Sequence, residues 1–143
     1  KAYEIASKSA SVGLVEPLQL PSWRSEGDEY KVSLEPGYGA TPTNSVQLLQ
    51  AVTCVLQGLS HLHKEQLVHR DVRWPNVVHG HRPGSRSEWM LVDLETVWQA
   101  GKAPSSRLHR IADVLLNGRY ELASDLRLVA RLMEDTCVAG TGA

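Results

Sequence analysis

The chain has 143 residues, of which 42% are hydrophobic and 22% charged, and its formal net charge is −1. This length suits one domain and is too short for two. The near-neutral charge excludes a bulk electrostatic attraction to nucleic acid or to an acidic membrane, and no apolar run reaches the roughly 18 residues of a membrane helix. The two cysteines, Cys54 and Cys137, form no C-x-x-C motif. This pattern predicts reduced thiols in a cytoplasmic, intracellular protein, with the nucleus left open.

Both ends of the chain look interrupted. It starts at Lys1 without a methionine or a signal-peptide pattern, and it ends in Ala-Gly-Thr-Gly-Ala directly after a helical pattern. We therefore expect this sequence to be a piece of a longer protein.

The first third of the chain predicts a few short elements. Residues 1–10 predict a short, weak helix, and residues 13–20 predict a strand that ends at a proline. Residues 30–34 alternate strictly between apolar and polar types and predict a second strand. The polar residues 22–29 predict a turn, so that the two strands would form the end of a small antiparallel sheet. Residues 35–43 hold two glycines and two prolines and predict a connector.

The clearest helix is predicted over residues 45–64. Its apolar residues recur at spacings of three and four, which is typical of an amphipathic helix. They are Leu48, Leu49, Val52, Val55, Leu56, Leu59 and Leu62. Asn44 or Thr43 is suited to cap the first turn, and Gln47 lies three residues after Asn44, as in a capping box.

The second half of the chain predicts a ribbon followed by helices. Residues 74–78 and 89–92 would pair as a hairpin-like ribbon across a polar loop. Residues 99–106 are small and polar and predict a mobile loop, and residues 108–117 predict one or two helical turns. Residues 124–133 predict a second amphipathic helix with a capping Ser or Asp.

The strongest functional signal lies in residues 67–78, Leu-Val-His-Arg-Asp-Val-Arg-Trp-Pro-Asn-Val-Val. Asp71 and Asn76 lie there between two apolar ends, and Asp93 follows the next apolar run. If the two runs pair as a hairpin, Asn76 and Asp93 approach the same point. Two acids and an amide brought together in this way predict a site for a metal-bound phosphate.

The spacing His69-Arg70-Asp71-(four residues)-Asn76, followed by Asp93, resembles the catalytic loop and the metal-binding Asp of the protein kinases. The neighbouring sequence Arg-Trp-Pro-Asn is similar to kinase-like domains of fungi and oomycetes. Several positions outside the loop also resemble segments of the protein kinases.

This resemblance covers about residues 13–133 and implies an α+β, protein-kinase-like fold that is partial. Residues 1–35 would be a remnant of the antiparallel N-lobe with the strand that leads to the hinge. Residues 36–143 would be a partial, mainly helical C-lobe with the catalytic loop and the activation segment.

The resemblance also implies roles for the residues of the loop. Asp71 would orient the acceptor hydroxyl and take its proton, and Arg73 would reach the transferred phosphate. Asn76 and Asp93 would hold Mg²⁺ through oxygen ligands. The expected activity is transfer of the γ-phosphate of ATP to Ser or Thr of a protein substrate, because the loop lacks the A-A-R of tyrosine kinases. The expected cofactors are ATP and Mg²⁺, without a nucleic-acid or membrane partner, and the oligomeric state stays open.

Two further segments match the family. Leu34-Glu35-Pro36-Gly37 would be the hinge, so Glu35 and Gly37 are expected to bind adenine through the backbone. Residues 112–118 are similar to the A-P-E segment that closes the activation loop, with Asp113 in place of the usual Glu.

Three residues would have structural or regulatory roles. Asp125 would accept hydrogen bonds from the backbone of the catalytic loop, and His69 is expected to be a hydrogen-bonded core residue rather than a base. Arg70 would pair either with a nearby carboxylate or with a regulatory phosphate. The candidate phosphorylation sites are Ser105, Ser106 and Thr96.

Several parts of a kinase are absent from the sequence, and they leave two alternatives open. Glu95 replaces the glycine of D-F-G, no Gly-rich phosphate loop is found, and the phosphate-anchoring lysine has no candidate beyond Lys1. A pseudokinase that acts as a binding or scaffold module would explain these departures. Asp93-Leu94-Glu95 also fits a small-molecule kinase of the same superfamily. The last C-lobe helices are missing too, so we expect an uncovered apolar helix face and either aggregation or marginal stability of the isolated chain.

Overall fold

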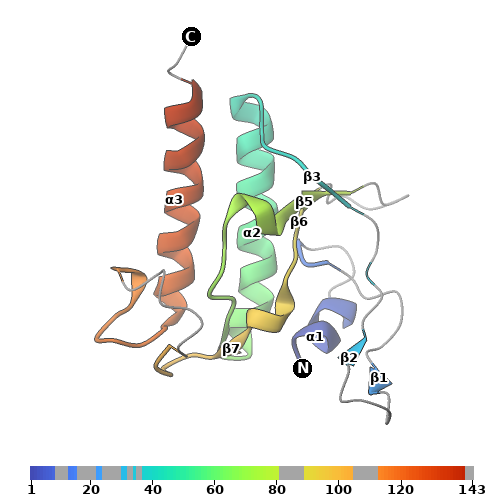
Figure 1. The fold of residues 1–143 in the computed structure, drawn as a ribbon, viewed down its shortest axis with the longest axis vertical. Helices are drawn as coiled ribbons and strands as arrows, with labels where there is room; N and C mark the ends of the chain where they lie inside the picture. Colours follow the sequence, from blue (N-terminus) through green and yellow to red (C-terminus); the bar gives the residue numbers. More distant parts are fainter. Residues whose placement is uncertain are drawn as a thin grey trace.

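The computed structural model describes residues 1–8, 13–15, 22–23, 30–31, 34, 37–80, 89–104 and 113–140. In these ranges the chain is an α+β protein with three α-helices and small antiparallel sheets, which confirms the predicted class. The helices are α1 (Ala2–Lys8), α2 (Ser45–Lys64) and α3 (Leu122–Gly140). Helices α2 and α3 run antiparallel and side by side, while α1 and most strands lie on the other side of α2 (Figure 1).

Helix α2 is the central element of the fold, and its cap is the predicted one. The Asn44 side chain accepts a hydrogen bond from the Gln47 N–H at 2.9 Å, and Gln47 Oε1 accepts one from the Thr43 N–H at 2.9 Å. Seven residues of its inner face are buried: Ala51, Val52, Cys54, Val55, Gly58, Leu59 and Leu62. The sequence predicts that Leu49 and Leu56 belong to the apolar face of this helix, but both side chains are exposed.

Helix α1 confirms the short helix that the sequence predicts, and it packs on α2 through Tyr3 and Ala6. The segment after it contacts α2 still more closely. Gly13 has a φ of +76°, and a Cβ at this position would lie 1.8 Å from the Cys54 carbonyl oxygen. A Cβ on Gly58 would lie 2.7 Å from the Gly13 oxygen. Only glycines permit this approach of two backbones.

The first strands differ in part from the prediction. Leu14 bridges Leu91 in parallel fashion, so the segment from Gly13 to Val15 joins the ribbon strand. β1 (Ser22–Trp23), expected in a turn, pairs antiparallel with β2 (Tyr30–Lys31). Residues 16–21 lie outside the described residues, so the rest of the predicted strand is not covered.

The predicted ribbon is confirmed and has one strand more than expected. β5 (Val77–His79) pairs antiparallel with β6 (Trp89–Leu91), and β3 (Tyr38–Gly39) pairs with the other edge of β5. β3 lies in the segment for which the sequence predicts a connector. Two residues between glycines and prolines carry no periodicity, so only the tertiary pairing reveals the strand.

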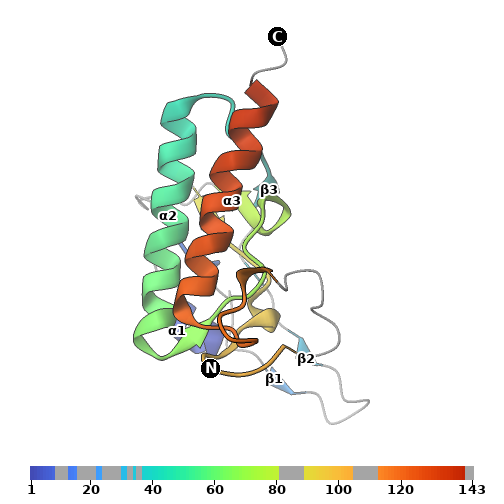
Figure 2. The same ribbon diagram turned by 90° about the vertical axis from the view of Figure 1, so that its left-hand side faces the viewer.

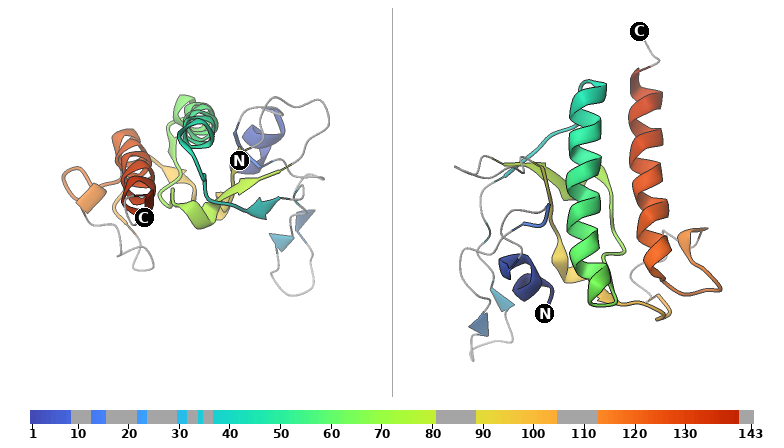
Figure 3. Two further views of the ribbon diagram at one scale, coloured as in Figure 1. Left: turned by 90° about the horizontal axis from the view of Figure 1, so that it is seen from above. Right: turned by 180° about the vertical axis from the view of Figure 1, so that it is seen from behind.

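A further strand pairing lies next to the loop of residues 69–76. β4 (Leu67–Val68) pairs antiparallel with β7 (Trp98–Gln99), which corrects the predicted loop at its first residue. The predicted helical turns at residues 108–117 lie partly outside the described residues. Seen from above, α3, α2 and α1 follow one another across the molecule, and β3 lies on the same side of α2 as α1 (Figure 3).

Helix α3 begins two residues before the predicted start at Ser124. The Ser124 hydroxyl accepts a hydrogen bond from the Glu121 N–H at 3.0 Å, and the Ser124 N–H returns one to the Glu121 carbonyl at 2.8 Å. Leu128, Val129 and Leu132 bury its inner face against α2, alongside which it runs (Figure 2). Among the helices described, none has the length and apolar character to cross a bilayer.

Candidate functional site

Asp125 is fully buried in the first turn of α3 and holds the start of the loop of residues 69–76. One carboxylate oxygen accepts the His69 N–H at 2.8 Å, and the other accepts the Arg70 N–H at 2.9 Å. His63 Nε2, near the end of α2, lies 2.9 Å from the first oxygen. These are the backbone contacts that the kinase resemblance implies for Asp125. They satisfy a buried carboxylate, which would be costly to leave without partners.

His69 is also fully buried and links the loop to the strand that precedes Asp93. Its Nε2 lies 2.9 Å from the Val92 carbonyl oxygen, and its Nδ1 accepts the Asp71 N–H at 3.4 Å. These partners assign a neutral ring with its proton on Nε2. Burial lowers the pKa of His69, and the nearby Asp125 charge only partly opposes this effect. His69 therefore behaves as a structural core residue, as the sequence predicts.

Asp71 sits at the centre of a small polar network in the loop. Arg73 Nε lies 3.0 Å from its carboxylate. Asn76 Nδ2 donates to the Asp71 carbonyl and to its carboxylate, both at 2.8 Å. Asn76 is buried in η1 (Trp74–Asn76), whereas the Arg73 side chain is 57% exposed. The Asn76 amide oxygen is thus the atom of that side chain that can bind a cation.

Asp93 lies next to this network, because the Val92 N–H donates to the Asn76 carbonyl at 2.9 Å. Burial raises the pKa of Asp93, and a hydrogen bond with Glu95 and the charges of Glu95 and Asp71 raise it further. Asp93 has a φ of +63°, a left-handed conformation that Asp tolerates better than most residues. The structure therefore brings together Asp71, Asn76 and Asp93, which the sequence separates by up to 22 positions.

Glu95 belongs to η2 (Leu94–Thr96), the turn that follows Asp93. Burial raises the pKa of Glu95, but a hydrogen bond from Tyr3 and the one with Asp93 outweigh it and leave the pKa below its usual value. Tyr3 Oη lies 2.6 Å from Glu95 Oε1. Tyr3 therefore holds the Glu95 carboxylate in the turn that follows Asp93.

The donor chemistry of this site fits Mg²⁺. Mg²⁺ prefers oxygen ligands and usually takes one or two carboxylates, with water and substrate phosphates completing its shell. Asp93 and Asn76 would supply the protein oxygens. In the part of the chain that the structure describes, no group of three or more His, Cys, Asp or Glu side chains is arranged to hold a metal. A site with two protein oxygens, whose shell water or phosphate oxygens complete, does not require such a group.

Arg70 is buried, and its guanidinium forms no ion pair with a carboxylate of the described residues, while its pairing with a regulatory phosphate stays a prediction. Its Nε donates to the Thr96 carbonyl at 2.5 Å, and its guanidinium carbon lies 5.8 Å from the ring centres of Trp98 and Tyr120. Such contacts are cation–π interactions. Across the described residues Arg70 thus contacts a carbonyl and two rings rather than a carboxylate.

The structure describes one of the three predicted phosphorylation sites, Thr96. The Thr96 hydroxyl already donates to the His69 carbonyl at 2.8 Å and lies 2.9 Å from the Asp93 carbonyl. A phosphate there would break this bond. Ser105 and Ser106 lie outside the described residues.

The remaining predicted residues lie elsewhere. Glu35 is outside the described residues. Gly37 is exposed next to β5, where a Cβ would lie 2.8 Å from Val78 Cγ2. Asp113 forms an ion pair with Arg131 of α3.

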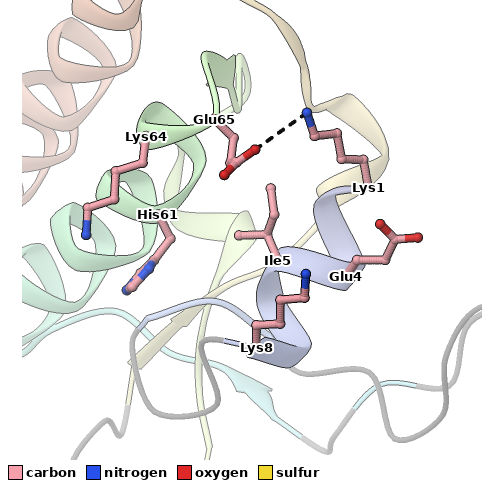
Figure 4. A pocket seen from close by; sticks show the side chains of 7 residues that line it. All are labelled: Lys1, Glu4, Ile5, Lys8, His61, Lys64 and Glu65. Atoms are coloured by element: carbon pink, nitrogen blue, oxygen red, sulfur yellow. Dashed lines mark ion pairs between the residues drawn. The ribbon is translucent and has the colours of Figure 1, made fainter.

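Lys1 does not approach the loop. Its Nζ lies 3.6 Å from Glu65 Oε2 at the end of α2. The two residues line a pocket of about 250 Å³ between α1 and α2 (Figure 4). None of the predicted site residues other than Lys1 lines this pocket, so Lys1 has no contact that would make it the phosphate-anchoring lysine.

The sequence did not single out three residues that hold this site. Tyr3 contacts Glu95 from 92 positions away, and Trp98 and Tyr120 flank Arg70. All three are aromatic, and aromatic residues in a sequence usually indicate core packing. No local signal separates an aromatic residue with a site contact from one without.

Comparison with known proteins finds one relative to report. No family model matches the sequence. The chain is similar to crinkler effector protein 8 of Phytophthora infestans, with 29% identity over 116 residues. The match covers 76% of this chain and 19% of the relative, so the chain spans about a fifth of the length of that protein.

Proposed function

We propose that this chain carries the catalytic loop and the metal-binding turn of a protein-kinase-like enzyme. The proposed reaction is transfer of the γ-phosphate of ATP to a Ser or Thr hydroxyl of a protein, with Mg²⁺. The observation that carries the proposal is the meeting of Asp71, Asn76 and Asp93 beside the β5–β6 ribbon. The two backbone hydrogen bonds to Asp125 support a kinase-like arrangement of α3 and the loop.

Each residue has a task that its position allows. Asp71 would accept the proton of the attacking hydroxyl, and Asn76 and Arg73 hold its carboxylate in place. Arg73, largely exposed, can turn from Asp71 to the transferred phosphate. Mg²⁺, when held by Asn76 and Asp93, supplies charge neutralisation on the phosphates. The protein does little covalent chemistry in phosphoryl transfer. Most of the catalysis therefore comes from the correct placement of these groups.

The experiment that tests the proposal is Asp71→Asn. Transfer of labelled phosphate from ATP to a Ser/Thr peptide library is measured on this chain and on the longer protein that we expect to contain it. We expect Asp71→Asn to lower the rate by about 10²- to 10⁴-fold, because general-base assistance is lost. The matched control is Asp135→Asn on an exposed position of α3, which should change the rate less than about twofold. Equal rates for Asp71→Asn and wild type would refute the proposal.

A pseudokinase is the second candidate, and Glu95 is the observation that favours it. Its carboxylate bonds both Tyr3 and Asp93, so the proposed metal ligand already has a partner. Binding of Mg·ATP, measured by calorimetry, separates the two candidates. Absence of nucleotide binding by the longer protein would favour the scaffold function.

The carboxylate pair Asp93 and Glu95 also fits a small-molecule kinase of the same superfamily. A substrate screen with radiolabelled ATP decides between protein and small-molecule acceptors. The similarity to a crinkler effector protein further supports the proposal that the chain is part of a longer protein of that type.

A further inference from the structure

Tyr3 is a buried aromatic residue with a polar contact at the candidate site. It lies on α1, which packs on α2 and on η2, and only 5% of its surface is exposed. Its hydroxyl donates to Glu95 Oε1 at 2.6 Å, a short bond between a hydroxyl and a carboxylate. The ring of Tyr3 is thus anchored in the core while its hydroxyl holds one oxygen of a turn residue.

Glu95 connects Tyr3 to the turn that begins at Asp93. Asp93 is the N-cap of η2 and Glu95 lies within it, and Leu94 between them is 2% exposed and anchors η2 in the core. The Thr96 hydroxyl lies 2.9 Å from the Asp93 carbonyl and closes the turn from its other end. The contact of Tyr3 with Glu95 therefore ties α1 to the short turn whose first residue is Asp93.

We propose that Tyr3 is a positioning residue that, from α1, holds Glu95 and through it sets the orientation of the Asp93 carboxylate toward a divalent cation. This inference rests on the proposed function, because Asp93 is there the cation ligand. Outer-shell hydrogen bonds of this kind orient metal ligands, and their removal typically weakens metal binding about 10- to 100-fold. Tyr3 would then couple the docking of α1 to the affinity of the site for its cation.

The test uses Mn²⁺ alone as the probe and the full 143-residue chain. Free Mn²⁺ is followed by its electron paramagnetic resonance signal, which is independent of any catalytic activity. We expect Tyr3→Phe to weaken Mn²⁺ binding about tenfold, because the ring stays in the core and only the hydroxyl is lost. The matched control is Tyr38→Phe, which removes an exposed hydroxyl bonded to His79 at 2.8 Å and should leave the Mn²⁺ affinity within about twofold.

A second variant separates positioning from packing. Glu95→Ala removes the carboxylate to which the Tyr3 hydroxyl donates, so Tyr3→Phe should cause little further loss of Mn²⁺ affinity in that background. A purely structural role of the Tyr3 hydroxyl would instead give the same loss in both backgrounds. All titrations are made well below the melting temperature of each variant, as measured by circular dichroism.

The outcomes distinguish this inference from the proposed function. If wild type binds Mn²⁺, Asp93→Asn does not, and Tyr3→Phe binds as tightly as wild type, the role of Tyr3 is overturned and the cation site stands. If wild type binds Mn²⁺ no better than Asp93→Asn, both the cation site and the role of Tyr3 are overturned.

Discussion

Asp125 and His69 are both fully buried polar residues, and each joins the loop of residues 69–76 to a different element. Asp125 ties the loop to α3 and α2, and His69 ties it to the strand end at Val92. Buried polar groups specify one arrangement only when every partner is in place. These two residues therefore fix the backbone on which Asp71 and Asn76 are presented.

The neutral state of His69 predicts a dependence of stability on pH. Burial lowers its pKa below the usual 6.5, with Asp125, the Val92 carbonyl and Asp71 opposing the shift and Arg70 adding to it. Below about pH 6.5 the unfolded chain binds a proton on His69, whereas the folded chain keeps this residue neutral. Acid therefore favours unfolding. We expect the free energy of unfolding to be highest above about pH 6.5 and to fall on acidification, by at most about 1.4 kcal/mol per pH unit from this group.

The measurement is urea unfolding at a series of pH values between about 7.5 and about 5.5. His69→Gln keeps a donor for the Val92 carbonyl but cannot titrate, so its stability should fall less steeply with acidification than that of wild type. The control is His79→Gln on β5, a histidine beside Tyr38 and Trp89 and away from the loop. Identical slopes for His69→Gln and wild type would contradict the assignment of a buried neutral ring.

The candidate site could be predicted from the sequence where its residues share one motif. Asp71, Asn76 and Asp93 follow a known spacing, and the structure brings them together. The contact of Tyr3 with Glu95 could not be predicted, because a hydrogen bond across 92 positions leaves no periodic or local trace. The partners of Arg70 were missed for the same reason, and its left-handed φ of +74° also has no sequence signal.

At the scale of elements, two glycines allow α2 to pack closely against the β5–β6 ribbon. Gly13 and Gly58 allow the segment that bridges Leu91 to lie directly on the helix backbone. This contact sets the distance between α2 and β6, and thus the position of the turn that carries Asp93.

A methyl group at Gly13 should therefore be strongly destabilising. Gly13→Ala would place Cβ 1.8 Å from the Cys54 carbonyl and would also require a left-handed alanine. Overpacking of about 1–3 kcal/mol and a conformational cost of about 1–2 kcal/mol predict a loss of roughly 3 kcal/mol in the free energy of unfolding. The control is Gly39→Ala on β3, whose Cβ would meet no atom within 4 Å. Equal midpoints of urea unfolding for the two variants would contradict this view of the α2 contact.

The sequence predicts those elements that have an amphipathic repeat or a capping residue of their own. Helix α2 was found with its capping residue, and α3 within two residues of its start, because amphipathic spacing extends over several turns. The strands β3 and β7 were missed, because each has two residues and exists only through its partner. The pairing of Leu14 with Leu91 was missed for a similar reason, since alternation predicts a strand but not its neighbour.

At the scale of the whole molecule, α3 presents an apolar stripe to solvent. Leu126, Ala130 and Met133 follow one another at spacings of four and three, and all three are exposed. Helix α2 adds exposed Val46 and Leu49 near its start. Contiguous exposed apolar surface favours association, which agrees with the expectation that the isolated chain aggregates.

The stripe on α3 gives the last prediction. Leu126→Glu with Met133→Glu should increase the monomer fraction of the isolated chain, because the change removes apolar surface and adds charge. The two side chains are 49% and 39% exposed, so the free energy of unfolding should change by less than about 1 kcal/mol. Light scattering after size exclusion, over a range of concentrations, measures the monomer fraction. The control, Gln50→Glu with Thr53→Glu, adds the same charge at exposed positions of α2 without removing apolar surface. A control that is as monomeric as the α3 variant would assign the effect to net charge, whereas a gain confined to the α3 variant assigns it to the stripe.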